Sequence, residues 1–132
     1  MSVDSAIAHF RRRQADVFRD EAILERPSGT TTFDPETGTE VPGPPTPVHT
    51  GPCLIRAFKW EGTDAEAGGV EARLRRFQVK FDVDVDARKD DIVRPIASTY
   101  DGSLVGRSFR VTDVARDGWQ ISRWLICEEI IE

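Results

Sequence analysis

Apolar residues recur at helical spacing only near the start of the chain. They fall in steps of 4, 3, 7 and 1, at Val3, Ile7, Phe10, Val17 and Phe18. This spacing places them on one face of an amphipathic helix. Ser2 or Asp4 is suited to cap the first turn, because a short polar side chain accepts a hydrogen bond from a free backbone N–H. The pattern therefore predicts a helix within residues 1–20.

After residue 20 the pattern changes to alternation. The clearest case is Phe77–Val85, where every second residue is apolar and the residues between are mostly charged. Alternation of this kind predicts a strand with one buried and one solvated face. Other strands are expected over residues 21–26, 30–33, 53–58, 91–94, 104–114 and 119–131. Pro95 is expected to end the strand over 91–94, and Asp117-Gly118 is a strong turn signal between the last two strands.

One helix followed by about six to eight short strands defines the expected fold class. Chains of this kind bury their strand faces by closing into a small barrel or a sandwich, and a barrel also removes exposed sheet edges. The prediction is mainly β: a small β-barrel with an N-terminal amphipathic helix and extended loops and arms. Residues 1–20 form the helix, and residues 21–132 form a single barrel domain.

Prolines concentrate in one part of the chain. Seven of the eight lie between Pro27 and Pro52. The densest run is a proline-rich segment, residues 41–47, and it contains Pro42, Pro44, Pro45 and Pro47. Proline cannot donate a ladder hydrogen bond, so this segment is expected to be extended, stiff and exposed. We predict that it is an arm that contacts a neighbouring subunit, because it is too polar and too stiff to join a core.

Composition and charge exclude several classes of protein. The chain has 132 residues, of which 39% are hydrophobic and 31% charged, as in a single globular domain. No apolar run is long enough for a membrane span or a signal peptide. Two cysteines are too few for a disulfide scaffold, which favours a reducing compartment. The net charge of −5 argues against a protein that wraps nucleic acid in a basic surface, but permits one that lets DNA pass.

The acidic run Asp82-x-Asp84-x-Asp86 has the spacing that opens an EF-hand calcium loop. The rest of that loop is missing, because Ala87 stands where a glycine must turn and Val93 stands where a bidentate glutamate is needed. We therefore predict that Asp82, Asp84 and Asp86 form a solvent-facing or channel-facing acidic surface without a metal ion.

No pattern indicates catalysis or a cofactor. His9 and His49 have no acidic or thiol partner at ligand spacing and are expected to be surface or partly packed residues. Cys53 and Cys127 lie in predicted strands and are expected in the core, as free cysteines usually are. The chain contains no nucleophile elbow, zinc-binding helix or phosphate-binding loop. The sequence thus predicts a protein that is not an enzyme and binds no cofactor or metal.

Several short sequence segments of the chain resemble a family of virion proteins from tailed bacteriophages that infect actinobacteria. Over the full length, the likeness is to head-to-tail connectors of the stopper type, which lie between the portal assembly and the tail. It is carried by Thr32-Phe33-Asp34-Pro35-Glu36-Thr37-Gly38, Val48-His49-Thr50-Gly51-Pro52-Cys53-Leu54-Ile55, Asp90-Asp91-Ile92-Val93, Leu104-Val105-Gly106-Arg107-Ser108-Phe109-Arg110-Val111-Thr112-Asp113-Val114 and Cys127-Glu128.

The resemblance implies a non-enzymatic structural protein of the virion, assembled in the host cytoplasm as a homo-oligomeric ring around the DNA channel. Such a ring retains packaged double-stranded DNA without sequence specificity and docks the tail. Its expected partners are portal or adaptor proteins on the head side and a tail terminator or tail tube protein on the tail side, with no membrane partner. Stoppers are usually six-fold rings, which is the favoured symmetry, and portal-proximal adaptors are usually twelve-fold. One alternative is a tail terminator or tail completion protein. The other, from a different class, is an OB-like ligand-binding barrel.

The segment between the two central predicted strands, residues 59–70, is expected to be a mobile loop. It combines three glycines with Glu61, Asp64 and Glu66, and it contains few apolar residues that could offset the entropy lost on ordering. Within a stopper ring, we expect these acidic residues at the lumen or the tail-facing rim, where they would gate the DNA channel. The alternative is an exterior loop without a role.

Overall fold

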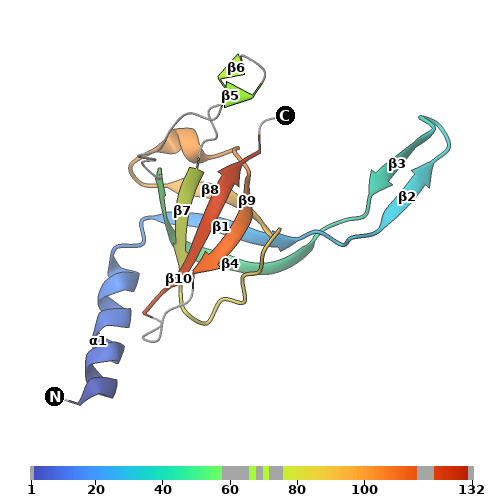
Figure 1. Ribbon diagram of the computed structural model, residues 1–132. Coiled ribbons are helices and arrows are strands. Elements are labelled where there is room, and N and C mark those ends of the chain that lie inside the picture. The colour runs from blue at the N-terminus through green and yellow to red at the C-terminus, as the bar shows by residue number, and fades with distance from the viewer. Residues whose placement is uncertain (1, 58–65, 68–69, 72–75, 116–120, 131–132) are drawn as a thin grey trace.

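A computed structural model describes residues 2–57, 66–67, 70–71, 76–115 and 121–130, and these form a closed barrel with projecting elements (Figure 1). The barrel order is β1-β4-β7-β10-β9-β8, and every neighbouring pair is antiparallel. The strands are β1 (Asp20–Arg26), β4 (Thr46–Ala57), β7 (Arg76–Phe81), β8 (Ile92–Ser98), β9 (Phe109–Ala115) and β10 (Arg123–Glu129). The predicted mainly-β barrel with one N-terminal helix is therefore confirmed.

The barrel interior is the hydrophobic core. Alternate residues of each strand point inward, as the period of a strand requires. Phe81, Phe109, Leu24 and Leu125 are fully buried, and the rings of Phe77 and Phe109 pack with centroids 4.6 Å apart. Cys53 and Cys127 are also fully buried in this core, as the sequence predicted.

Helix α1 (Val3–Asp16) is shorter than predicted and lies outside the barrel (Figure 1). Ser2 is its N-cap and accepts a hydrogen bond from the Ser5 amide. The helix ends in a tight turn, in which the Val17 and Phe18 amides donate to the carbonyls of Gln14 and Ala15. The chain then enters β1 at Asp20, which the sequence had assigned to the helix.

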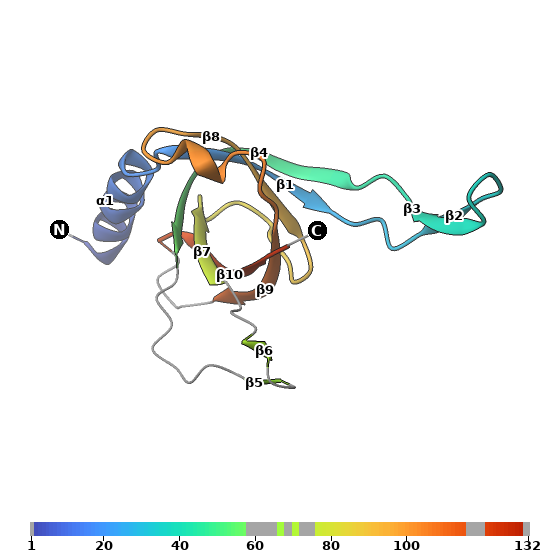
Figure 2. The same cartoon turned by 90° about the horizontal axis from the view of Figure 1, so that it is seen from above.

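A hairpin projects from the barrel on the side opposite α1 (Figure 2). It consists of β2 (Thr31–Asp34) and β3 (Thr39–Pro42), which pair with each other. The turn is closed by the Gly38 amide donating to the Asp34 carbonyl at 2.9 Å, and Gly38 adopts a left-handed φ of 70°. We call residues 27–45, which join β1 to β4, the hairpin arm.

The hairpin arm differs in extent from the prediction for residues 41–47. Thr46 and Pro47 belong to β4, where they pair with Arg26 and Glu25 of β1. Proline is accommodated there because the register of the pair shifts next to Glu25. The projecting element therefore ends at residue 45, and Pro47 is part of the barrel wall.

The strand predicted over Phe77–Val85 is wrong at its end. Strand β7 stops at Phe81, and the chain turns so that the Val85 amide donates to the Asp82 carbonyl at 3.1 Å. The alternation nevertheless separates buried from exposed residues, because Val85 is buried and Val83 half-buried while Asp82, Asp84 and Asp86 are exposed.

Three further strand boundaries are wrong. Strand β4 begins at Thr46 and not at Cys53, because residues in 46–52 pair with β1. Strand β8 continues through Pro95 to Ser98, because the register against β1 shifts between Glu21 and Ala22 and leaves Pro95 opposite Ala22. Leu104 lies in the 3-10 helix η1 (Gly102–Leu104) and not in a strand, since Asp101 caps this helix through the Ser103 amide. Strand β9 therefore begins only at Phe109.

Within the predicted loop 59–70, a short hairpin of β5 (Glu66–Ala67) and β6 (Val70–Glu71) is present. Glu61 and Asp64 lie outside the described residues, as does the predicted turn at Asp117-Gly118. Over the part of the chain that the structure describes, no helix is long and apolar enough to cross a membrane.

Candidate interaction surfaces

Helix α1 presents an apolar face that the rest of the described chain does not cover. None of its residues is buried: Val3 and Phe10 are exposed by 64% and 46%, and Ile7 is half-buried. The C-cap residue Val17 is 48% exposed. An isolated helix of this length is marginally stable in water, because most helix stability in proteins comes from packing of an amphipathic face. The apolar face of α1 is therefore a candidate docking surface.

Two of three consecutive arginines border this apolar face. At about 100° per residue, Arg11 and Arg13 lie on either side of the line through Val3, Ile7 and Phe10, and Arg12 lies on the back of the helix. All three arginine side chains are exposed. A partner that binds the apolar face would thus meet positive charge at its rim.

The hairpin arm is the second candidate surface, and it also carries uncovered apolar side chains. Phe33 is 67% exposed and Val41 is 43% exposed. Phe33 lies opposite Glu40 in the ladder, so the two side chains share one face of the hairpin. A two-stranded hairpin is marginally stable by itself. The prolines assigned to inter-subunit contact, Pro42, Pro44, Pro45 and Pro47, are all exposed.

All charged residues of the hairpin arm are acidic. Between residues 27 and 45 the acidic residues are Asp34, Glu36 and Glu40, and no lysine, arginine or histidine occurs, so the formal charge is −3. The hairpin arm and α1 therefore carry charges of opposite sign next to their exposed apolar side chains.

The acidic residues Asp82, Asp84 and Asp86 lie in the loop between β7 and β8, and all three are exposed. The structure does not use them as one cluster. Asp86 forms an ion pair with Arg88 at 3.1 Å, and its backbone carbonyl accepts a hydrogen bond from Arg26 at 2.9 Å. Within the described ranges, no group of three or more His, Cys, Asp or Glu residues is placed to hold a metal ion.

Calcium binding is therefore expected to be absent at this loop. Titration of the protein with calcium at about millimolar concentration should show no saturable heat, because one carboxylate is already paired with Arg88 and the loop lacks the glycine and glutamate of a calcium loop. A stoichiometric site that is lost in Asp84→Asn would contradict this prediction.

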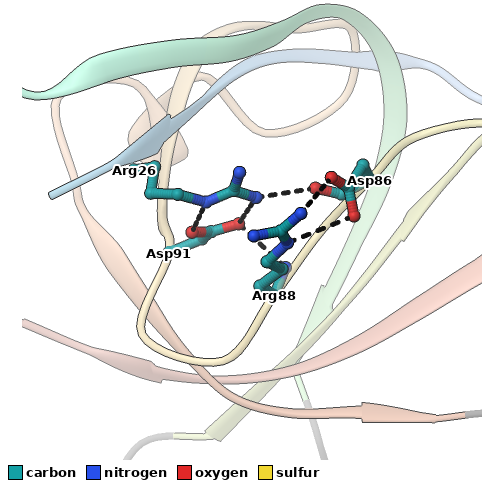
Figure 3. A network of polar contacts seen from close by, with 4 residues as sticks. All are labelled: Arg26, Asp86, Arg88 and Asp91. Atoms are coloured by element: carbon teal, nitrogen blue, oxygen red, sulfur yellow. Dashed lines mark hydrogen bonds and ion pairs between the residues drawn. The ribbon is translucent and has the colours of Figure 1, made fainter.

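Figure 3 shows a polar network that no pattern in the sequence predicted. Asp91 is 1% exposed and accepts two hydrogen bonds from Arg26, through Nε at 3.1 Å and Nη2 at 3.2 Å. It also accepts a hydrogen bond from the Arg88 backbone amide at 2.8 Å. The hydrogen bond to Asp91 is the main cause that raises the pKa of the Arg26 guanidinium. This network joins β1 to the loop before β8, and its role is structural.

A second buried carboxylate, Asp20, joins three strands at the start of β1. It accepts hydrogen bonds from the Ile55 amide at 2.9 Å and from the Ser98 hydroxyl. Beside it lies an open depression of about 440 Å³, whose lining includes Phe18, Arg19 and Pro52. Asp20 is committed to these two hydrogen bonds, and among the residues that line the depression no histidine or cysteine accompanies it.

The two cysteines are shielded from solvent. Burial raises the pKa of both the Cys53 and Cys127 thiols to about 12. Since the thiolate is the reactive form, each thiol carries about a thousandfold less thiolate at neutral pH than an ordinary cysteine. His49, by contrast, packs edge-on against Phe81 with ring centroids 5.6 Å apart, and His9 is exposed on α1.

The thiols should therefore be unreactive in the folded protein. Ellman's reagent is expected to detect no thiol under native conditions and two thiols per chain in concentrated urea, because only unfolding exposes them. Fast reaction of either cysteine in the native protein would contradict its placement in the core.

Comparison with known proteins identifies a family and a fold. A model for the family of unknown function DUF6093 matches residues 10–128. No curated protein matches the sequence. The solution structure of protein SF1141 from Shigella flexneri 2a is similar, with a TM-score of 0.57 and 14% sequence identity, covering 85% of this chain and 92% of that one. At this identity the likeness concerns the fold alone.

Proposed function

This chain belongs to the family of unknown function DUF6093, and we propose that it is a structural virion protein, a stopper-type head-to-tail connector of a tailed bacteriophage. In this role, copies of the chain form a ring around the DNA channel between the portal or adaptor and the tail. The ring retains packaged DNA and presents the surface on which the tail docks. The proposal includes no catalytic activity and no cofactor.

The observation that carries the proposal is the pair of uncovered elements on a closed barrel. A barrel has no free edge through which to pair with another chain. Here α1 and the hairpin arm extend from opposite sides of the barrel (Figure 2). Each also exposes large apolar side chains. Apolar surfaces of this kind on projecting elements are typical of chains that assemble with neighbours.

The negative net charge of the chain supports the proposal that DNA passes through the ring without binding to it. A net charge of −5 repels the phosphate backbone on average. Asp82, Asp84 and Asp86 are exposed on one loop, so they are available to face a channel or solvent. We extend the proposal to Glu61, Asp64 and Glu66, as acidic residues of a loop at the lumen or at the tail-facing rim.

Deletion of the gene from the phage that encodes the chain tests the proposal. The expected result is that DNA-filled or leaking heads accumulate separately from complete tails, and that a wild-type copy of the gene restores infectious particles. Electron microscopy of the lysate distinguishes the outcomes. Tails of irregular length on intact heads would favour the tail terminator alternative. Normal infectious particles would remove the chain from the head-to-tail junction.

A further inference from the structure

We infer that the hairpin arm of one copy binds the apolar face of α1 in a second copy. The inference deepens the proposed function, on which it rests for its place in a ring, by naming the two surfaces that join neighbouring subunits. It is argued from three features of the described residues: exposed apolar side chains, opposite charge and placement on opposite sides of the barrel.

Both surfaces expose a phenylalanine side chain. Phe33 stands on the hairpin arm, and Phe10 stands at the middle of the α1 face with Val3 and Val17 toward its ends. Neither element contributes a residue to the barrel core. Contact between them would bury both sets together, and it would supply the packing that a short helix and an isolated hairpin each lack.

The charges are complementary. The hairpin arm carries −3 and no positive residue, whereas α1 carries three consecutive arginines and has its two aspartates, Asp4 and Asp16, toward its ends. Glu40 lies beside Phe33 on one face of the arm, and Arg13 borders Phe10 on α1. Opposite charges at the rim of an apolar contact orient the partners and raise the rate of association.

The placement of the two surfaces decides which copies meet. They lie on opposite sides of the barrel in both views, so an arm reaches the helix of another copy and not its own (Figures 1 and 2). A contact between two different surfaces is heterologous, and repetition of such a contact generates a ring when the rotation closes. A symmetric helix-to-helix contact would instead bring two arginine clusters together, and an arm-to-arm contact would bring two acidic arms together.

Charge reversal tests the contact directly. Glu40→Lys and Arg13→Glu are each expected to weaken self-association about tenfold in sedimentation experiments. The double variant is expected to recover most of that loss, because it restores the ion pair with exchanged signs. Asp113→Lys and Lys89→Glu, which change the charge equally at exposed sites outside both surfaces, serve as controls. The inference would be overturned if the single variants associate like these controls. It would also be overturned if the wild-type chain stays monomeric up to about 1 mM.

Mixing of complementary variants tests the head-to-tail arrangement. Phe33→Ser with Glu40→Lys blocks the arm, and Phe10→Ser with Arg13→Glu blocks the helix. Each variant alone should be monomeric and should keep a cooperative urea-unfolding transition of the barrel, since neither surface is part of the core. The mixture should form one-to-one dimers, because each mixed pair keeps one intact arm and one intact helix. A mixture that remains monomeric would overturn the inference.

Incorporation into particles separates this inference from the proposed function. If copies assemble through these surfaces but the protein is absent from the neck of the virion, the proposed function fails and the inference stands. If the protein is present in the neck and both single variants are incorporated and dock tails like the wild type, the inference fails and the proposed function stands.

Discussion

Replacing Asp91 by alanine is expected to destabilise the fold by about 3 kcal/mol, because a buried carboxylate that accepts charged hydrogen bonds is removed from its partners. Asp91 is 1% exposed, and its two oxygens accept from Arg26 at 3.1 and 3.2 Å and from the Arg88 amide at 2.8 Å. The substitution leaves the guanidinium and the amide without this acceptor. The measurement is urea unfolding, read as a lower midpoint at unchanged slope.

Asp86→Ala is the matched control for this prediction. Asp86 belongs to the same network, but its side chain and that of Arg88 are both 64% exposed. An exposed ion pair contributes little, so the control is expected to change the free energy of unfolding by less than about 1 kcal/mol. Equal effects of Asp86→Ala and Asp91→Ala would show that burial of Asp91 does not matter. A double-mutant cycle with Arg26→Ala then measures the coupling in the Arg26–Asp91 pair.

Removing the hairpin arm is expected to abolish self-association and leave the barrel folded. Arg26 and Thr46 are paired neighbours in β1 and β4, so Asn-Gly can join them through a two-residue turn in place of residues 27–45. No residue of the hairpin arm belongs to the core. The free energy of unfolding should therefore stay within about 0.5 kcal/mol of the wild-type value, while sedimentation should show only monomer.

A variant shortened only at the tip of the hairpin arm provides the comparison. Replacing residues 35–38 by Asn-Gly keeps Phe33 and Glu40, which carry the inferred contact, and should retain self-association. If the full removal unfolds the protein instead, the arm is part of the folded unit. If the full removal assembles like the wild type, neither the arm nor its contact with α1 has a role in assembly.

Local patterns in the sequence predicted the class of the fold and most of the strands. The alternation that starts at Phe77 identified residues that are buried, and it did so even beyond Phe81, where the strand ends. The helical spacing near the N-terminus identified α1, although its end was misplaced by four residues. Cys53 and Cys127 were correctly assigned to the core.

Two of the errors occur where a distant segment overrides the local preference. Pro95 would end an isolated strand, yet β8 continues because β1 opposite it shifts register. Asp20 looked like the end of a helix, but its carboxylate is held by the Ile55 amide and the Ser98 hydroxyl, both far along the chain. The strand boundaries at these points depend on partners that no local window contains.

By itself, the sequence determined the alternation of buried and exposed residues, the presence of one helix and an acidic, proline-rich stretch. These follow from backbone geometry within a few residues, which repeats at two positions in a strand and 3.6 in a helix. Only the tertiary structure decided the closure of β8 on β1, the pairing of Arg26 with Asp91 and the placement of α1 and the hairpin arm on opposite sides of the barrel. The physical reason is that these features depend on contacts between segments distant in the chain. Their free energy belongs to the pair of segments and not to either one alone.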